Sequence, residues 1–179
     1  MTKEDTEDRM SEDNSVHKAQ PFEVRPFATA DLDAVIRINQ ITLPENYPRH
    51  FFLSVHSSCP AGFQVATICS GAKSRLIGYT MARVEVGTSN FSRFKLVRKG
   101  HIISVAVLKN FREMGIAKAL LSESLEAVRQ KGASESFLEV RESNLPAVRL
   151  YERLGFQIKK RLRKYYRDGE AAYLMALAF

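Results

Sequence analysis

The sequence predicts a single α/β (α+β) domain, with a mixed, mostly antiparallel sheet of about seven strands flanked by about four helices. Three observations support this fold class. The 179 residues are close to one domain's worth and can bury a sizeable core without disulfides. Strand–helix–strand units occupy the middle of the chain, and hairpins lie on both sides of them. The composition, 45% apolar and 26% charged, is that of a globular protein.

Elements in the first half follow from periodicity and turn signals. Alternation predicts a first strand, and a spacing near 3.6 behind Thr29 and Asp31 predicts a helix. Pro44 and Pro48 bracket a loop before a short second helix, and two β-rich segments around a turn then predict a hairpin. The expected ranges are strand 22–25, helix 32–38, helix 51–55, strand 63–69, turn 71–74, strand 76–86 and a polar, basic loop over 87–99.

The second half alternates strands and helices. An almost continuously apolar run predicts a strand buried on both faces, and the helix after it ends at Gly132. Asn144 begins the next helix, which tolerates Pro146 in its first turn and closes at Gly155. The expected ranges are strand 101–108, helix 116–130, strand 136–140, helix 144–155, strands 156–162 and 171–177, and a turn over 167–169.

Charge is spread unevenly along the chain. Residues 1–20 hold three basic and six acidic side chains and no aromatic residue, so we expect a disordered acidic tail. The remaining residues, 21–179, hold 24 basic and 14 acidic side chains and form the expected domain. Its basic character predicts an anionic partner, either a nucleic acid, a ribosome surface or a phosphorylated small molecule.

Several classes of protein are excluded by missing signals. The first residues contain no apolar h-region, and polar residues crowd the uncharged stretch 51–72, so we expect neither a signal peptide nor a membrane helix. Cys59 and Cys69 cannot make a disulfide framework, which favours a reducing, cytoplasmic location. There is no P-loop, no dinucleotide fingerprint and no metal-ligand spacing among the histidines, so no metal is expected.

The most informative segment runs from Arg112 to Ala117, between the buried strand and a helix. Small residues at Gly115 and Ala117 let backbone amides face outward where the helix begins. Those N–H groups and the helix dipole make an anion site that suits a pyrophosphate. The alternative is an ordinary turn with a solvated Arg112.

In context, this segment resembles the acetyl-CoA pyrophosphate loop of the GNAT N-acetyltransferase superfamily, Gln/Arg-x-x-Gly-x-Gly/Ala. Leu138-Glu139-Val140-Arg141 and the later Ala147-x-x-Leu150-Tyr151-x-x-Leu154-Gly155-Phe156 also resemble that superfamily. Leu43-Pro44-Glu45-Asn46-Tyr47, Gly100-His101-Ile102 and the run 164–173 resemble the N-terminal protein acetyltransferases. That likeness is closest to the NatA catalytic subunit and its archaeal homologues, and more distant to the bacterial ribosomal-protein alanine acetyltransferase. It covers about residues 22–177, and Glu113 departs from it where a basic residue is frequent.

The resemblance implies a GNAT-like sheet that opens between a splayed parallel pair of strands, here 102–107 and 137–140, to take acetyl-CoA as co-substrate. Backbone groups of Ser104, Val105 and Val107 would hold pantetheine. Asn144 would hydrogen-bond the cofactor arm, although an ordinary helix cap explains it equally. The amides expected to hold the pyrophosphate are those of Arg112, Glu113, Met114, Gly115, Ile116, Ala117 and Lys118.

The resemblance also implies catalytic roles. In the family, the side chains at the positions that match His101 and Glu139 act through an ordered water. The resemblance therefore implies that these two side chains together accept the amine proton. Tyr151 would donate a proton or hydrogen bond to the CoA thiolate. The competing interpretations are a satisfied core histidine, a strand-edge acid and a tyrosine packed on the buried side of a helix. An α-amine has a pKa of about 7.7–8.0, so its neutral form needs only modest base assistance at neutral pH.

Substrate contacts are assigned by the same resemblance. Leu43, Glu45 and Tyr47 would line the opening for the peptide, with Glu45 and Tyr47 shaping the pocket for its first residue. Tyr165 and Tyr166 would hydrogen-bond the peptide backbone. Aromatic residues in loops are otherwise commonly packing residues.

Together these features predict an enzyme that moves acetyl from acetyl-CoA to the α-amine of protein N-termini with Ser, Ala or Met starts, by direct attack in a ternary complex. One alternative is acetylation of lysines or a small amine. Another is a ribosome- or nucleic-acid-binding module with a vestigial CoA site. The basic run 159–167 suits a solvated face, ribosomal RNA, acidic nascent chains or an auxiliary subunit, and no specific DNA binding is expected.

Overall fold

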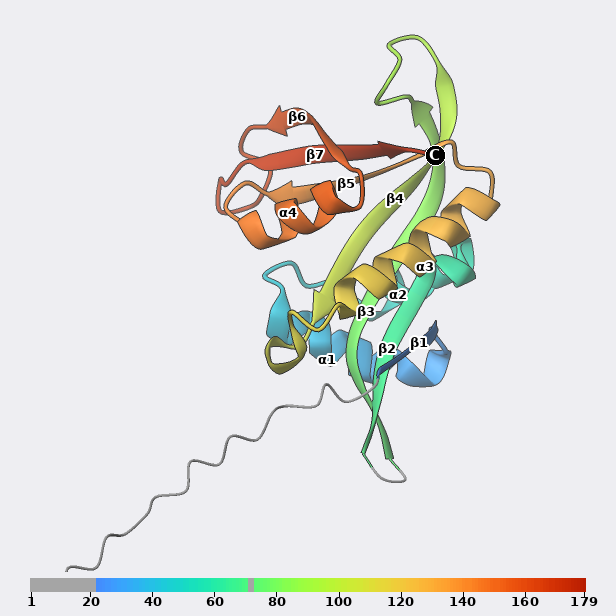
Figure 1. Cartoon of the computed structure of the whole chain (residues 1–179), viewed down its shortest axis with the longest axis vertical. Helices are drawn as coiled ribbons and strands as arrows, with labels where there is room; N and C mark the ends of the chain where they lie inside the picture. The colour runs from blue at the N-terminus through green and yellow to red at the C-terminus, as the bar shows by residue number, and fades with distance from the viewer. Residues whose placement is uncertain (1–21, 71–72) are drawn as a thin grey trace, which may run out of the picture.

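The computed structural model describes residues 22–70 and 73–179 as one seven-stranded sheet with helices on both faces (Figure 1). The strand order is β1-β2-β3-β4-β5-β7-β6, and only the β4–β5 pair is parallel. This confirms the predicted mixed, mostly antiparallel sheet. The strands are β1 (Phe22–Pro26), β2 (Phe63–Ser70), β3 (Lys73–Thr88), β4 (Leu96–Val107), β5 (Glu135–Arg141), β6 (Gln157–Leu162) and β7 (Ala172–Ala178).

Four α-helices cover the sheet, as predicted. They are α1 (Leu32–Thr42), α2 (Arg49–Ser58), α3 (Ile116–Gln130) and α4 (Leu145–Arg153). The apolar stripes of α1 and α2 pack on one face of β2, β3 and β4, around Phe63 and Tyr79. Those of α3 and α4 pack on the opposite face, around Ile102, Leu138 and Met175. Burial on both faces explains why the middle of β4 reads as a continuous apolar run.

Expectations for residues 1–20 and for Gly71 and Ala72 of the predicted turn lie outside the described residues. The second helix is longer than the predicted 51–55, since α2 begins at Arg49 and ends at Ser58. None of the described helices is long and apolar enough to cross a membrane.

The loop predicted over 87–99 is wrong in extent. β3 and β4 continue as a paired two-stranded extension, with Val86 opposite Arg98 and Thr88 opposite Leu96. Only residues 89–95 form the connection. Val86, Thr88, Leu96 and Arg98 are all exposed. The opposite face is half-buried at Gly87 and Val97. Because the apolar Val86 and Leu96 lie on the exposed face, the apolar–polar pattern of the sequence does not mark this hairpin.

The parallel pair β4–β5 is short. Its pairs are Lys99 with Glu135, Gly100 with Ser136 and His101 with Phe137, and the two strands separate beyond them. Gly100 is required here, because a Cβ at this position would collide with Val128 of α3. The Ser136 hydroxyl donates to the Gly100 carbonyl at 2.8 Å. These contacts fix where the sheet divides, and the resulting fork between β4 and β5 matches the predicted splayed pair.

A β-bulge in β4 lies just beyond that fork. Met81 pairs with Ser104 and Ala82 with Ile102, so Ile103 has no partner of its own. Ile103 packs into the core under α1 and α2, and the Ser104 hydroxyl on the same side meets that of Tyr79 at 2.9 Å. Bulges are common beside active sites because they re-aim side chains. Here the bulge changes which side chains of β4 face each side of the sheet.

Candidate active site

Two cavities meet at the fork between β4 and β5. One cavity, of about 850 Å³, lies toward the α1–α2 and β6–β7 loops, and we call it the peptide-side cavity because it contains the residues predicted to contact the peptide. The other, of about 840 Å³, lies toward the start of α3 and along α4, and we call it the cofactor-side cavity because it contains the predicted pyrophosphate loop. Both are lined by five shared residues, namely Thr42, Leu43, Val105, Asn144 and Tyr151. These shared residues form a junction, where a ligand in one cavity can contact a ligand in the other.

The cofactor-side cavity contains most of the predicted pyrophosphate loop. Gly115 precedes α3 with φ +79°, and Glu113 also has a positive φ of +66°. No acidic residue occupies the first turn of α3, so its positive dipole end stays available to an anion. The predicted residues that line this cavity are Val105, Val107, Arg112, Glu113, Gly115, Ile116, Ala117, Lys118 and Asn144.

Two predicted cofactor residues lie elsewhere. Met114 is not among the lining residues; its side chain packs against the buried cluster of Ile116 and Leu120. Ser104 lines the peptide-side cavity. Two residues that the sequence reasoning missed, Arg149 and Arg153 of α4, line the cofactor side. Their spacing of four places them on one helix face, and this is the signal that could have found them.

The structure brings His101 and Glu139 together at the end of the parallel pairing. Their closest atoms, His101 Nε2 and Glu139 Oε2, are 2.9 Å apart. The imidazole stacks on Phe137, with ring centroids 4.3 Å apart. Both side chains are largely buried and line the peptide-side cavity. The pair can therefore share a proton within the peptide-side cavity.

A further carboxylate, Glu85 of β3, faces the other side of the same imidazole. Its Oε2 lies 3.9 Å from His101 Nδ1, which is buried and has no hydrogen-bond partner among the described residues. Arg83 holds that carboxylate from its Nε at 3.0 Å. The sequence reasoning missed Glu85. Its position on β3 could have indicated it. Glu85 lies two residues from Arg83, on the same face of the strand, and Arg83 pairs directly with His101.

Tyr151 lies on α4 and lines both cavities. Its ring packs edge-on against Phe156 at 5.9 Å. Burial raises the pKa of its phenol to about 12, so the hydroxyl stays protonated at neutral pH. A protonated phenol at the junction can donate a hydrogen bond to a departing thiolate.

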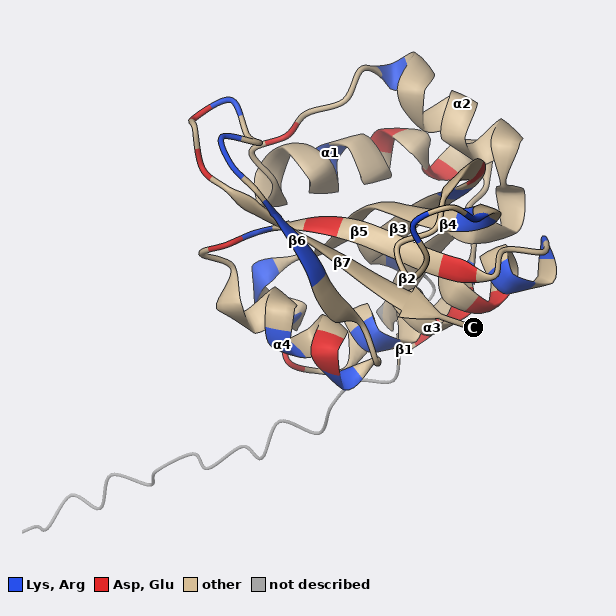
Figure 2. Ribbon diagram, turned by 90° about the horizontal axis from the view of Figure 1, so that it is seen from above, with Lys and Arg blue, Asp and Glu red and all other residues tan. Residues whose placement is uncertain are grey.

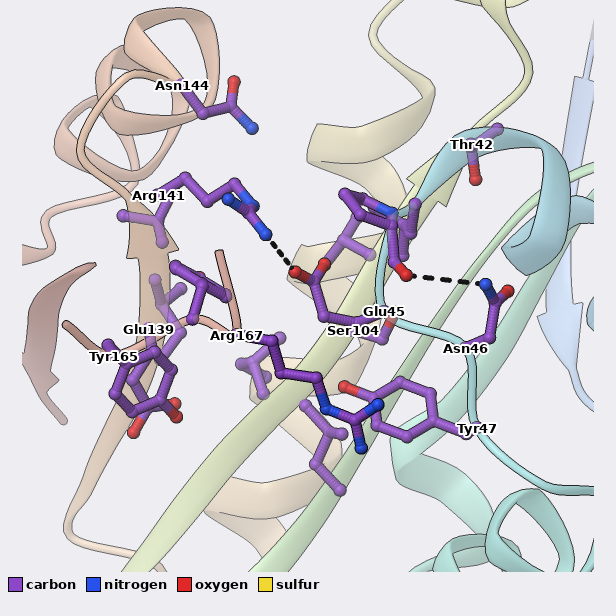
Figure 3. A pocket seen from close by; sticks show the side chains of 18 of the residues that line it. Thr42, Glu45, Asn46, Tyr47, Ser104, Glu139, Arg141, Asn144, Tyr165 and Arg167 are labelled. Carbon is purple, nitrogen blue, oxygen red and sulfur yellow. Dashed lines mark hydrogen bonds and ion pairs between the residues drawn. The ribbon is translucent and has the colours of Figure 1, made fainter. Parts of the chain in front are cut away.

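Asn144 caps α4, because its Oδ1 accepts from the Ala147 amide at 3.3 Å. The competing interpretation of Asn144 as an ordinary cap therefore accounts for this contact. Its side chain also lines both cavities, and its place at the junction keeps a cofactor contact available (Figure 3). That contact stays a prediction.

The predicted substrate residue Glu45 is held by Arg141, which the sequence reasoning had not singled out. Arg141 donates to Glu45 at 2.5 Å, to Asp168 at 2.7 Å and to Glu170 at 2.6 Å. Its guanidinium also lies 4.0 Å from the Tyr166 ring centroid. Figure 3 shows the Arg141–Glu45 contact bridging β5 and the α1–α2 loop. One cation therefore ties both loops of the peptide-side cavity to the sheet.

Hydrogen bonding keeps Arg141, Asp168 and Glu170 ionised. Burial disfavours the Arg141 cation, but its bonds with Glu45, Glu170 and Asp168 outweigh that effect and raise its pKa above the ordinary value. The pKa of Glu170 is lowered by bonds from Ser143 and then from Arg141. The pKa of Asp168 is lowered by the Glu170 amide and then by Arg141.

The predicted tyrosines and Leu43 also line the peptide-side cavity. Burial and then the charges of Glu45 and Glu139 raise the pKa of Tyr47. Burial and then the Glu139 charge raise the pKa of Tyr165 to about 12, and burial with Glu45 raises that of Tyr166. These hydroxyls stay protonated, and each can donate a hydrogen bond to a peptide carbonyl.

Comparison with known proteins is consistent with this geometry. Residues 32–156 match the model of the acetyltransferase (GNAT) family. The N-alpha-acetyltransferase of Sulfurisphaera tokodaii is 45% identical over 161 residues, which cover 89% of this chain and 94% of that protein. Catalytic subunit ard1 of the N-terminal acetyltransferase A complex of Schizosaccharomyces pombe is 37% identical, with 86% and 84% covered. The crystal structure of Ard1 from Thermoplasma volcanium superposes with a TM-score of 0.74 at 30% identity, covering 88% of this chain and 97% of that one.

Proposed function

The chain belongs to the acetyltransferase (GNAT) family, and from that membership and its forked site we propose that it transfers acetyl from acetyl-CoA to the α-amine of protein N-termini. The relative of Sulfurisphaera tokodaii, similar over nearly its whole length, is named for this activity. The observation that carries the proposal is the meeting of the two cavities: Tyr151 lines both of them, and the His101–Glu139 pair lines the peptide-side cavity.

The chemistry requires a neutral amine to attack the thioester carbonyl, so that an N–C bond forms and the C–S bond breaks. The amine proton passes to the His101–Glu139 pair, which lies on the peptide side. The sulfur leaves toward Tyr151, whose phenol is protonated and available as a donor. Direct attack in a ternary complex follows from having both substrates meet at one junction.

Acetyl-CoA is the acetyl donor of this family, and the cofactor-side cavity is suited to it. Amides of the loop before α3 and the open helix N-terminus favour the pyrophosphate. The main chain of Val105 and Val107 runs along the same cavity, where it can bond pantetheine. Glu113 also lines this cavity, and the cations Arg112, Lys118, Arg149 and Arg153 outweigh its charge.

The peptide-side cavity supports protein N-termini over lysine side chains, while Ser, Ala or Met starts are proposed from the family resemblance. Glu45 and the tyrosines lie around the opening and can hold a peptide's first residue and backbone. An α-amine with a pKa near 7.7–8.0 also deprotonates far more readily than a lysine amine near 10.4. Acetylation of lysine or of a small amine is the second candidate, and the same assay separates it.

The basic surface suits a ribosome or an auxiliary subunit, since the ard1 relative is the catalytic subunit of a complex. A cytoplasmic location agrees with the two free cysteines, Cys59 and Cys69.

The test incubates the purified chain with acetyl-CoA and peptides beginning with Ser, Ala, Met-Leu or Met-Glu, each with an internal lysine. Tandem mass spectrometry then locates the acetyl group. Acetyl on the α-amine, lost in the His101→Ala, Glu139→Gln double variant, is expected. Acetyl on the internal lysine would move the assignment to a side-chain acetyltransferase. Acetyl-CoA binding without transfer to any peptide would contradict the proposed activity of the chain alone.

A further inference from the structure

The extension of β3 and β4, which we call the arm (residues 86–98), carries exposed apolar side chains. Phe94 is 99% exposed, Leu96 73% and Val86 72%, and Phe91 is 40% exposed. Figure 1 shows the arm projecting beyond the body of the sheet, near the C-terminus. Four exposed apolar side chains on one short hairpin, rimmed by polar residues, are typical of an interaction site.

The arm's tip is an ordered turn. Buried Glu135 accepts from the Ser89 hydroxyl at 2.6 Å and from the Asn90 amide and side chain, both at 2.8 Å. The Ser89 hydroxyl in turn accepts from the Phe91 amide at 3.0 Å, and the Ser89 amide donates to the Lys95 carbonyl at 2.9 Å. Phe94 is therefore presented by a preorganised turn, which lowers the entropic cost of using it in binding.

Charge at the tip has one sign. Phe94 lies between Arg93 and Lys95, and residues 86–101 contain no Asp or Glu. Within the part of the chain that the structure describes, no carboxylate forms an ion pair with Arg93, Lys95 or Arg98. The tip thus alternates aromatic and cationic side chains with no counter-charge of its own.

Strand β6 extends this surface. Lys159 Nζ lies 3.8 Å from the Phe91 ring centroid and joins the arm to the strand. Residues 156–167 hold six Lys or Arg and no Asp or Glu, and Figure 2 shows cations on β6 and on the loop that follows it. Only Arg161 of the six has a carboxylate partner, Glu142, among residues 22–70 and 73–179. β6 is also an edge strand of the sheet.

We propose that this arm–β6 surface, the arm tip 91–95 with β6 and Arg163 and Lys164 beyond it, binds single-stranded RNA. Bases have π-faces that stack on exposed aromatic side chains whatever the sequence, and phosphates pair with the flanking cations. Six residues of strand span about 20 Å, long enough to contact several consecutive phosphates. Phe94 lies directly between two cations, whereas the centre of a protein–protein interface is depleted in charged residues, which favours RNA over a protein partner. The inference goes beyond the acetyl transfer proposed above and does not depend on it.

The test measures fluorescence anisotropy of a labelled, unstructured RNA of about 12 nucleotides with the whole chain. Phe94→Ser is expected to weaken binding by roughly 5- to 100-fold through loss of stacking. The double variant Arg93→Glu, Lys95→Glu is expected to weaken binding further and to flatten its dependence on salt. Acetylation of a short peptide is expected to be unchanged in both, which separates this result from any failure of the catalytic proposal.

Matched controls use exposed residues of α1, on a remote element. Arg37→Glu repeats a charge reversal, and Ile41→Ser repeats the loss of an exposed apolar side chain. Both are expected to bind RNA like the parent chain. The proposal fails if the parent chain shows no saturable binding at low salt, or if the controls weaken binding as much as the arm variants do.

Other occupants give distinct results, and each overturns the proposal. Equal binding of a polyglutamate peptide or of phosphatidylserine vesicles would show a general anion surface. Equal affinity for a matched single-stranded DNA would remove the assignment to RNA. Concentration-dependent self-association in sedimentation, abolished by Phe94→Ser, would make a second copy of the chain the occupant.

Discussion

The two cavities at the fork are built by opposite means. The cofactor side takes its main feature from one continuous segment, in which the backbone of residues 112–118 turns into α3 with Gly115 at φ +79°. The peptide side is assembled from side chains of five separate segments, and Arg141 ties two of them, the α1–α2 and β6–β7 loops, to β5. A backbone site depends on local conformation, whereas a side-chain site depends on contacts that the whole fold must bring together.

The net charge of each cavity lining is opposite in sign to the charge of its proposed ligand. The cofactor-side lining has four cations and one carboxylate, a formal charge of +3, which favours phosphates. The peptide-side lining has Glu45, Glu139 and Asp168 against Arg141 and Arg167, a formal charge of −1 with neutral histidine. An ammonium group is therefore drawn to the peptide side, and a polyphosphate to the cofactor side. This contrast suits the placing of the two substrates proposed above.

The largest effect is expected from the proton-accepting pair, which belongs to the peptide side alone. The His101→Ala, Glu139→Gln double variant is expected to lower kcat by about 10²- to 10⁴-fold, the usual contribution of general base catalysis. Acetyl-CoA binding, measured by calorimetry, is expected to be unchanged because neither side chain lines the cofactor-side cavity. Glu126→Gln, on the exposed face of α3, serves as the control. A variant that loses acetyl-CoA binding would show that the two cavities are not separable.

The next effect concerns Arg141, the cation that organises the peptide side. Arg141→Ala leaves Glu45, Asp168 and Glu170 without their shared partner. We expect kcat/KM for peptide to fall by roughly 30-fold, equivalent to about 2 kcal/mol, with KM for acetyl-CoA unchanged. Arg141→Lys should restore only part of this, because a lysine cannot bond three carboxylates with a planar fork. Full activity in Arg141→Ala would show that the two loops hold their positions without it.

Tyr151, shared by both cavities, should give an intermediate result. Tyr151→Phe removes the hydroxyl while keeping the packing on Phe156, and we expect kcat to fall about tenfold, the value of one hydrogen bond. The effect is modest because a thiol with a pKa near 8.5 is already a good leaving group. Steady-state kinetics with both substrates should show unchanged KM values. A rate equal to that of the parent chain would leave Tyr151 as a packing residue.

A matched pair of glycines compares the two sides directly. Gly115 and Gly169 have φ of +79° and +87°, and an added Cβ would meet nothing within 4 Å at either. Alanine at each position therefore adds only backbone strain, about 1–2 kcal/mol. Gly115→Ala should raise KM for acetyl-CoA a few-fold, and Gly169→Ala should raise KM for peptide. If both substitutions change the same KM, the assignment of acetyl-CoA to one cavity and of the peptide to the other is wrong.

The same contrast explains what the sequence could reveal. The pyrophosphate loop, the start of α3 and the Asn144 cap are local patterns, so residues 112–118 could be found without a structure. The partners of Arg141 lie 96, 27 and 29 positions away along the chain, and no periodicity encodes such contacts. The bulge at Ile103 and the arm were missed for a related reason. Backbone pairing defines both, and neither has a repeating apolar pattern.

The smallest expected effect is the response of the peptide side to acid. The pKa values of Asp168 and Glu170 are lowered in the folded chain, partly through Arg141, so their ionised forms stabilise the fold above the ordinary carboxylate range near pH 4. That contribution is lost as the pH falls through the lowered values. Urea unfolding should therefore show Arg141→Ala less stable than the parent chain at about pH 7, with the gap closing near pH 3. Arg129→Ala removes an exposed ion pair of α3 with Glu126, whose pKa is also lowered, and is the control for a general acid effect. A gap of the same size at both pH values would mean that Arg141 stabilises the fold by packing on Tyr166 rather than by charge, and the peptide side would then be held together much as the core is.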